Sequence, residues 1–140
     1  MYKYLNLIHI YIYMEKINNN LNILIFPSGS GVAKEIFDSL KYIRWINIIG
    51  SDFNDKNFSY YEFKHLELNA PFIKDENDTI LYLKNIIKKH NIDCIYPAFD
   101  SILVFLKNKE KELGVKIICS PIETCNLCVS KSNTYNLLHN

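Results

Sequence analysis

The sequence predicts an α/β domain with a doubly wound, mainly parallel five-stranded sheet and helices on both faces. Three observations lead to this fold class. Short apolar runs alternate with segments of helical periodicity along most of the chain, as in β-α-β units. The apolar runs lack polar alternation, which is typical of strands covered on both faces. The 140 residues are 49% hydrophobic, which suits one domain with its own core.

The expected strands are apolar runs that end at turn-forming residues. The first run, Asn-Ile-Leu-Ile-Phe, stops at Pro27 and is followed by two glycines. The five strands are expected at residues 22–26, 46–50, 65–68, 93–96 and 115–119. Because crossovers between parallel strands are almost always right-handed, the leading strand order is 3-2-1-4-5, a Rossmann-like topology.

The helices between these strands are predicted from apolar stripes and capping residues. Val32, Ile36 and Leu40 recur at helical spacing, which indicates one buried helical face. Gly114 is placed to end a later helix, as the residue after its last turn. The expected helices lie near residues 32–40, 78–91 and 102–113, and residues 52–61 are expected to form a loop.

The clearest helix start follows the fifth strand. Ser120 is expected as the N-cap, with Pro121 at the first helical position and Glu123 three residues after the cap. The pair Cys125-x-x-Cys128 lies in this helix, and no second ligand pair accompanies it. We therefore expect two small apolar side chains on one helical face, rather than a zinc or redox site.

A ligand site is expected where the connections of the sheet diverge. Strands one and four are neighbours there, and ligands of such sheets bind beyond the carboxyl ends of the strands. The loops 27–31 and 97–100 should meet at this point. The first loop precedes a helix whose free N–H groups could hold a phosphate or carboxylate, although a tight turn without a ligand is the alternative. Its candidate residues are Ser28, Gly29, Ser30 and Gly31.

Two carboxylates accompany this expected site. Asp100 precedes the helix 102–113 and is expected as its N-cap, as a ligand-facing carboxylate, or as both. Gly29-x-Gly31 matches the start of the glycine-rich turn of dinucleotide-binding domains. Asp52 follows the second strand, at roughly the position where those domains carry an acidic residue. Lys34 stands at the third glycine position of that fingerprint, which is therefore incomplete.

Composition and missing motifs exclude several classes of function. The formal net charge is +1, so no general positive field favours nucleic acid or an anionic membrane. The apolar run 5–13 is too short to cross a bilayer and is not a convincing signal peptide. We expect a cytoplasmic protein with reduced thiols, in which residues 1–20 are an extension and translation starts at Met14. The sequence has no nucleophile elbow, Walker A or HExxH motif.

Several pieces of the second half carry a family resemblance through their order and spacing. They are Pro97-Ala98-Phe99-Asp100, a helix with Leu106 and Asn108, Leu113-Gly114-Val115-Lys116, Ser120-Pro121, and Ser130-Lys131-Ser132-Asn133-Thr134-Tyr135-Asn136-Leu137-Leu138. Together they resemble the end of the N-terminal domain of ATP-grasp enzymes, above all proteins similar to the carbamoyl-phosphate synthase large subunit. Looser agreement extends the resemblance forward to residue 21.

This resemblance implies an enzyme that uses ATP and Mg²⁺ to activate a carboxylate as an acyl phosphate, which is then passed to an amine. It also implies that Lys131 reaches the nucleotide phosphates, a task suited to a point charge. Under this interpretation, residues 21–129 form the Rossmann-like domain that precedes the ATP-grasp fold. Residues 130–140 would be the beginning of the ATP-grasp domain.

The length of the chain determines whether we expect it to catalyse a reaction with ATP by itself. Phosphoryl transfer needs metal and charge positioned around the phosphates, and no residues follow Asn140 to build the lobes that clamp ATP. We therefore expect the chain alone to be non-catalytic, and to act on a small-molecule substrate together with a missing ATP-grasp domain or partner chain. The alternatives are a stand-alone module that binds a nucleotide or small anion, and a fragment of an NAD-binding oxidoreductase.

Overall fold

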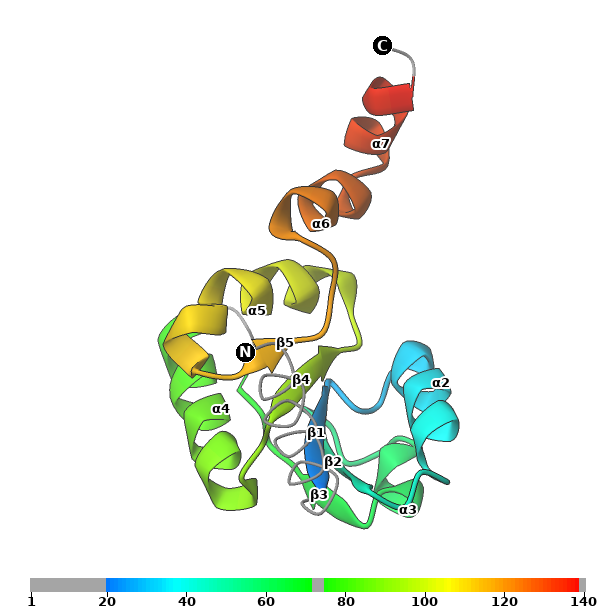
Figure 1. Ribbon diagram of the computed structural model, residues 1–140, viewed down its shortest axis with the longest axis vertical. Helices are drawn as coiled ribbons and strands as arrows, with labels where there is room; N and C mark the ends of the chain where they lie inside the picture. Colours follow the sequence, from blue (N-terminus) through cyan, green and yellow to red (C-terminus); the bar gives the residue numbers. More distant parts are fainter. Residues whose placement is uncertain (1–19, 72–74, 139–140) are drawn as a thin grey trace, which may run out of the picture.

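The computed structural model describes residues 20–71 and 75–138, which contain a parallel sheet of five strands. Each pair of neighbouring strands is parallel, and the order is β3-β2-β1-β4-β5. The strands are β1 (Leu21–Phe26), β2 (Ile46–Ser51), β3 (His65–Glu67), β4 (Cys94–Pro97) and β5 (Lys116–Ile117). The predicted fold class and strand order are confirmed (Figure 1).

Helices cover both faces of the sheet (Figure 1). The helices of the described residues are α2 (Gly31–Leu40), α3 (Ser59–Glu62), α4 (Glu76–His90), α5 (Asp100–Leu113), α6 (Ile122–Val129) and α7 (Lys131–Leu138). Helices α2 and α3 lie on one face, and α4 and α5 lie on the other. The chain runs outward from β1 to β3 and then returns to β4 beside β1, which produces this doubly wound arrangement.

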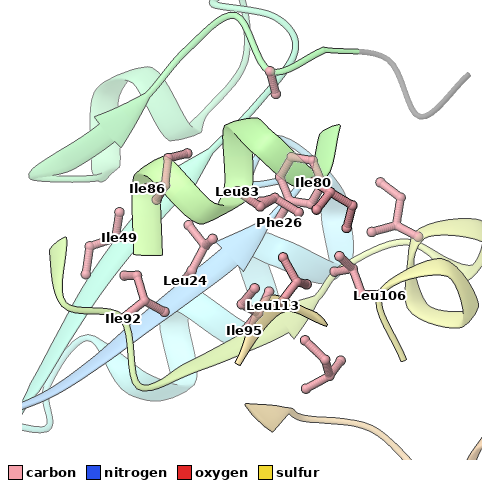
Figure 2. Close-up of a cluster of buried hydrophobic side chains, with 13 residues drawn as sticks. Leu24, Phe26, Ile49, Ile80, Leu83, Ile86, Ile92, Ile95, Leu106 and Leu113 are labelled. Atoms are coloured by element: carbon pink, nitrogen blue, oxygen red, sulfur yellow. The ribbon is translucent and has the colours of Figure 1, made fainter. Parts of the chain in front are cut away.

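The central strand β1 contributes to two hydrophobic clusters. Leu24 and Phe26 are fully buried in the larger cluster with Leu83 of α4 and Leu106 of α5 (Figure 2). Ile25 is fully buried in the smaller cluster, together with residues of α2. Successive side chains of a strand point to opposite faces, so one apolar run supplies both cores. This explains why the sequence of β1 lacks polar alternation.

Two predicted helix caps are wrong. Helix α5 begins at Asp100 itself, because the backbone is extended only as far as Phe99, which is the N-cap and makes no side-chain capping bond. Helix α6 begins at Ile122, because Pro121 has an extended ψ of 151° and takes the N-cap position. Ser120 therefore lies one residue too early to cap α6. The predicted helix end at Gly114 is confirmed, with a φ of 71° in the left-handed region.

Two further elements differ from the sequence prediction. The expected loop 52–61 contains the start of the short helix α3. At this start, the Ser59 N–H donates a hydrogen bond to the side-chain oxygen of Asn57 at 2.9 Å. Val32, placed by its spacing on the buried face of α2, is 57% exposed. The buried stripe of α2 is therefore narrower than its apolar sequence suggests, and it consists of Ala33, Ile36 and Phe37.

The last two helices lead away from the sheet (Figure 1). Helix α6 packs against α5, and α7 packs against α6. Among the side chains of these two helices whose exposure is described, Leu127 at 36%, Val129 at 47% and Tyr135 at 62% are exposed. Among the described helices, none has the length and apolar character needed to cross a bilayer. The expected extension 1–20, with its start at Met14, lies outside the described residues except for Asn20.

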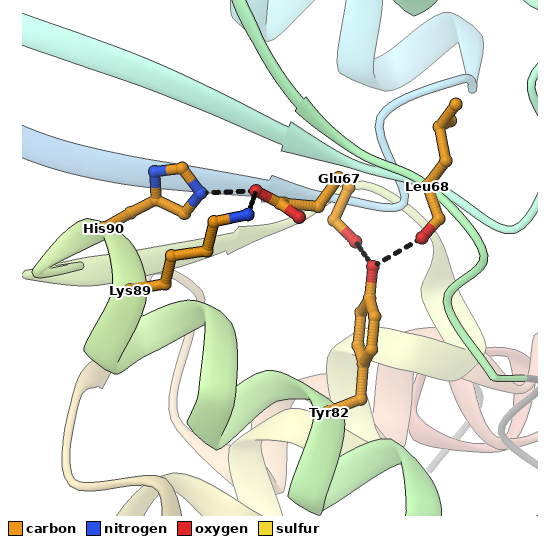
Figure 3. Close-up of polar contacts among 6 residues, drawn as sticks. Glu67, Leu68, Tyr82, Lys89 and His90 are labelled. Atoms are coloured by element: carbon orange, nitrogen blue, oxygen red, sulfur yellow. Dashed lines mark hydrogen bonds and ion pairs between the residues drawn. The ribbon is translucent and has the colours of Figure 1, made fainter.

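Glu67 connects the end of β3 to the last turn of α4 (Figure 3). Its Oε1 accepts a hydrogen bond from Lys89 Nζ at 2.7 Å and lies 2.6 Å from His90 Nε2. On the same helix, the Tyr82 hydroxyl lies 3.0 Å from the Ser51 hydroxyl at the end of β2. These contacts hold α4 against the carboxyl ends of β2 and β3.

Replacing Glu67 by glutamine should lower the free energy of unfolding by about 0.5–1 kcal/mol at neutral pH. Burial raises the pKa of Glu67, but hydrogen bonds from Lys89 and His90 outweigh burial, and the pKa falls below 4.5. Folding thus favours the charged form of Glu67. The charged side chain contributes to the free energy of unfolding above the pKa of the unfolded state, and this contribution is lost as the pH falls through the lowered pKa of the folded state.

Urea unfolding of the wild type and Glu67→Gln, from pH 7 down to about pH 3, measures this contribution. The difference between the two proteins should shrink toward the acid end. A difference of the same size at every pH would show that Glu67 does not stabilise the fold through its charge.

Candidate functional site

The two loops at the switch point are in direct contact. The Ser30 hydroxyl, in the loop after β1, donates a hydrogen bond to the carbonyl of Ala98, in the loop after β4, at 2.8 Å. The Ala98 N–H in turn donates to the carbonyl of Phe26 at 2.9 Å. Since β1 pairs with both β2 and β4, the connections diverge here, as the predicted strand order requires.

The turn after β1 leaves several polar groups without a partner. Ser28 is completely buried, and its hydroxyl has no hydrogen-bond partner among residues 20–71 and 75–138. The Ser30 hydroxyl caps α2 by accepting the Ala33 N–H at 3.0 Å. Within the same described ranges, the N–H groups of Ser30, Gly31 and Val32 have no acceptor. They belong to the positive N-terminus of a helix, which favours a bound anion.

Asp52 is bound into the same turn from the end of β2. Its side chain is almost buried, with the residue 6% exposed, and its Oδ2 accepts the Gly29 N–H at 2.5 Å. Its Oδ1 accepts the Asn54 N–H at 3.0 Å. Both carboxylate oxygens therefore already have backbone donors. These two bonds hold the turn after β1 against the loop after β2.

Asp52→Asn should lower the free energy of unfolding by about 1–3 kcal/mol, because an amide has only one acceptor oxygen for the two buried N–H groups. The NH₂ group of the new asparagine side chain would face one of the two backbone N–H groups and could not accept its hydrogen bond. Guanidinium unfolding measures the loss, and Asp55→Asn on the exposed part of the same loop is a matched control that should change stability by less than about 0.5 kcal/mol. Equal stabilities of the two variants would contradict this role of Asp52.

Asn57 is a residue of this site that the sequence analysis missed. A Cβ on Gly29 would lie 2.5 Å from Asn57 Cγ and 2.9 Å from Asp52 Oδ2. Asn57 Nδ2 donates to the carbonyl of Asn54 at 2.7 Å, so its side chain is held in place. The asparagine-rich stretch after β2 was the available signal, since Asn and Asp side chains commonly fold a loop onto its own backbone.

Asp100 lines a cavity whose lining does not include the turn after β1. A cavity of about 270 Å³ lies beyond the carboxyl ends of β4 and β5, beneath the start of α6. Asp100 contributes the one charged side chain of its lining. The lining residues are Tyr96, Pro97, Asp100, Leu103, Ile118, Cys119, Ser120, Thr124, Cys125, Cys128 and Val129. The structure therefore separates Asp100 from Ser28, Gly29 and Asp52, although one loop connects the two places.

Three cysteines line this cavity. The Cys125 thiol donates to the carbonyl of Ser120 at 3.2 Å, and the Cys119 thiol donates to the carbonyl of Ile117 at 3.9 Å. Burial, followed by the neighbouring Cys125 thiol, raises the pKa of Cys119. Cys125 is 4% exposed, but Cys128 is exposed to solvent. Cys125 and Cys128 both line the cavity, so the two side chains of the pair lie on one face of α6.

Lys131 begins α7 and is exposed. It lies two residues beyond Val129 and does not line the cavity. In the ranges 20–71 and 75–138, no group of three or more His, Cys, Asp or Glu side chains is arranged to hold a metal ion. These residues therefore do not fit the Mg²⁺ that the family resemblance implies.

Comparison of the sequence with protein-family models and with curated proteins finds no match. The candidate site among the described residues thus consists of the turn after β1 and the cavity lined by Asp100.

Proposed function

We propose that this chain is the substrate-side domain of an ATP-dependent carboxylate–amine ligase of the ATP-grasp type. In such a reaction, ATP converts a carboxylate into an acyl phosphate, which an amine then attacks. The domain would contribute an anion-binding turn and one wall of the substrate site. The parallel sheet in the order 3-2-1-4-5 supports this proposal, as does the resemblance of the segment 97–138.

The observation that carries the substrate role is the set of unpartnered donors in the turn after β1. Three consecutive N–H groups, from Ser30 to Val32, lie at the N-terminus of α2 beside the buried Ser28 hydroxyl. Such a group of donors suits a carboxylate or phosphate oxygen. The adjacent Asp52 carboxylate accepts hydrogen bonds from two backbone N–H groups. It would still repel an anion, which favours weak, orienting contacts over tight binding.

The nucleotide and Mg²⁺ would be held by a second domain, carried by the same polypeptide or by another one. Two observations support this division of labour. The described residues lack an acidic cluster for Mg²⁺, and the arm formed by α6 and α7 exposes Leu127, Val129 and Tyr135. An apolar arm that leads away from the sheet is typical of a connection that packs against a neighbouring domain.

The anion site is tested by NMR titration of the ¹⁵N-labelled chain with inorganic phosphate, and separately with acetate. The amide signals of Ser30, Gly31 and Val32 should shift and saturate together. Ser28→Ala should weaken the response several-fold if its hydroxyl contributes a donor. Non-saturating shifts of amide signals near lysine residues across the surface would contradict the proposed site. The absence of any change at these three amides would contradict it as well.

A stand-alone anion-binding module is the second candidate, because the same turn supports it without any partner. The two candidates differ in the role of the arm. Under the ligase proposal, polar substitution of Leu127 and Val129 should leave phosphate binding unchanged and should abolish association with the ATP-binding domain. A stand-alone module would bind phosphate in the same way but would not associate with an ATP-binding domain.

A further inference from the structure

The cavity beyond the carboxyl ends of β4 and β5 is built from four separate segments. Its walls come from the end of β4, the start of α5, the segment after β5 and one face of α6. Its volume of about 270 Å³ lies just below the range of about 300–1,000 Å³ that is usual for pockets that bind small molecules. A cavity of this size suits a compact organic molecule, rather than a dinucleotide or a peptide.

Most of the cavity walls are apolar. Leu103 of α5, Ile118 after β5 and Val129 of α6 contribute aliphatic side chains, and Tyr96 and Pro97 contribute the end of β4. Val129 is 47% exposed, so this part of the wall is open to solvent. An apolar group placed against these walls would remove hydrocarbon surface from water, which is favourable.

Asp100 gives the cavity its charge. Among the residues that the structure describes, it is the one charged residue of the lining, and its carboxylate has no hydrogen-bond or ion-pair partner. Lys107, two turns further along α5, is paired instead with Glu110 at 2.7 Å. Burial raises the pKa of Cys119, so this thiol stays neutral near pH 7 and adds no second charge. The cavity therefore presents a single negative charge within largely apolar walls.

We propose that this cavity binds a small organic cation, namely a primary ammonium compound with a compact aliphatic body. The ammonium group would pair with the Asp100 carboxylate, which has no cation of its own. An ammonium carries three N–H donors. Ser120 and Thr124 of the lining bring hydroxyl groups that can accept the remaining two. The aliphatic body would lie against the apolar side chains of the walls.

This cation site differs from the turn after β1 in the charge that it favours. The turn offers N–H donors and suits an anion, whereas the cavity offers a carboxylate. The two loops are joined by the hydrogen bond from the Ser30 hydroxyl to the carbonyl of Ala98, two residues before Asp100. The turn is nevertheless not part of the cavity lining. The cation site thus goes beyond the ligase proposal and does not depend on it.

NMR titration of the ¹⁵N-labelled full chain with 3-methylbutylamine at pH 7 tests the cation site. The neutral molecule 3-methylbutanol has nearly the same shape and serves as the reference ligand. The amine should shift the amide signals of Asp100, Leu103, Thr124 and Cys128 along one saturating curve and leave those of α2 unchanged. The alcohol should bind at least about tenfold more weakly, because it cannot form the charge-assisted pair with Asp100.

Asp100→Asn keeps the shape of the side chain and removes its charge. It should weaken binding of the amine at least about tenfold and leave binding of the alcohol unchanged. Glu123→Gln is the matched control, because it removes one negative charge from the exposed first turn of α6, outside the cavity lining. This control should bind the amine within about twofold of the wild type, since solvent and salt screen an exposed charge.

Cys128→Lys gives a second test that leaves α5 unchanged, in case Asp100→Asn fails to fold. Cys128 lines the cavity from an exposed position on α6. A lysine there would bring its own ammonium group to the cavity and repel the added amine. The saturating shifts with 3-methylbutylamine should therefore disappear.

Three results would overturn the proposal. Equal binding of the amine and the alcohol would show an apolar cavity without preference for a cation. Equal losses in Asp100→Asn and Glu123→Gln would show a general effect of net charge. The absence of saturating shifts around the cavity would show that it takes no such ligand. The phosphate titration reports on the amides of the turn after β1, so failure of the anion site and failure of the cation site are distinguishable.

Discussion

Replacing Leu83 by alanine is expected to lower the free energy of unfolding by about 2–5 kcal/mol. Leu83 lies in the middle of α4, and none of its surface is exposed. It packs with Leu24 of β1 and Leu106 of α5 in the larger hydrophobic cluster. The truncated side chain would leave a cavity between α4 and the sheet that its neighbours fill only in part. The loss should be a large fraction of the total stability of a domain of this size.

Leu81 provides the matched control for this experiment. It lies on the same helix, two residues earlier, but is 61% exposed. Leu81→Ala removes the same atoms and should change the free energy of unfolding by less than about 0.5 kcal/mol. Urea unfolding followed by circular dichroism measures both variants. Similar losses for Leu81 and Leu83 would contradict the assignment of the buried face of α4.

Replacing Gly29 by alanine is expected to cost about 1–3 kcal/mol and to disturb the anion-binding turn. The new methyl group would overlap the side chain of Asn57 and press on Asp52. Asn57 cannot move away freely, because its amide donates to the carbonyl of Asn54 and its oxygen accepts the Ser59 N–H. The substitution should therefore also abolish the saturable shift of the Ser30 and Gly31 amides on addition of phosphate.

Gly31 is the control for Gly29 in the same turn. A Cβ at Gly31 would have no neighbour within 4 Å, and its position is the first residue of α2. Gly31→Ala should be neutral or stabilise the fold by up to about 1 kcal/mol, because alanine favours a helix more than glycine does. Thermal unfolding and the phosphate titration measure both substitutions. A Gly31 variant as damaged as the Gly29 variant would contradict the described packing of the turn.

The strand order could be predicted because it depends on signals that act along the chain. A run such as that of β1 is apolar at every position since its residues enter two cores, with Leu24 on one face and Ile25 on the other. Strands of this kind need helices on both sides, and the handedness of crossovers then leaves few topologies. Gly114 ends α5 in the left-handed conformation for an equally local reason.

The helix starts and the site geometry depend on contacts that the sequence does not contain. Ser120 has the chemistry of an N-cap, but the extended backbone of Pro121 moves the start of α6 by one residue. Asp52 has the position of a ribose-binding acid, but the turn after β1 supplies it with the Gly29 N–H. For Asp52, a segment distant in sequence thus supplies the hydrogen-bond partner.

The cavity beneath α6 illustrates the same limit. Its lining joins the end of β4, the start of α5, the segment after β5 and one face of α6. No spacing along the sequence indicates that these segments meet. Asp100 likewise faces this cavity because α5 begins at that residue, and not two residues later.

The genomic DNA on both sides of the coding sequence tests the central claim most directly. The proposal that this domain acts beside an ATP-clamping domain predicts that an in-frame continuation or an adjacent reading frame encodes the two lobes that hold ATP and the acidic residues that bind Mg²⁺. Flanking DNA without such lobes would contradict an ATP-binding domain in the same polypeptide, and sustained ATP hydrolysis by the purified chain alone would contradict the central claim itself.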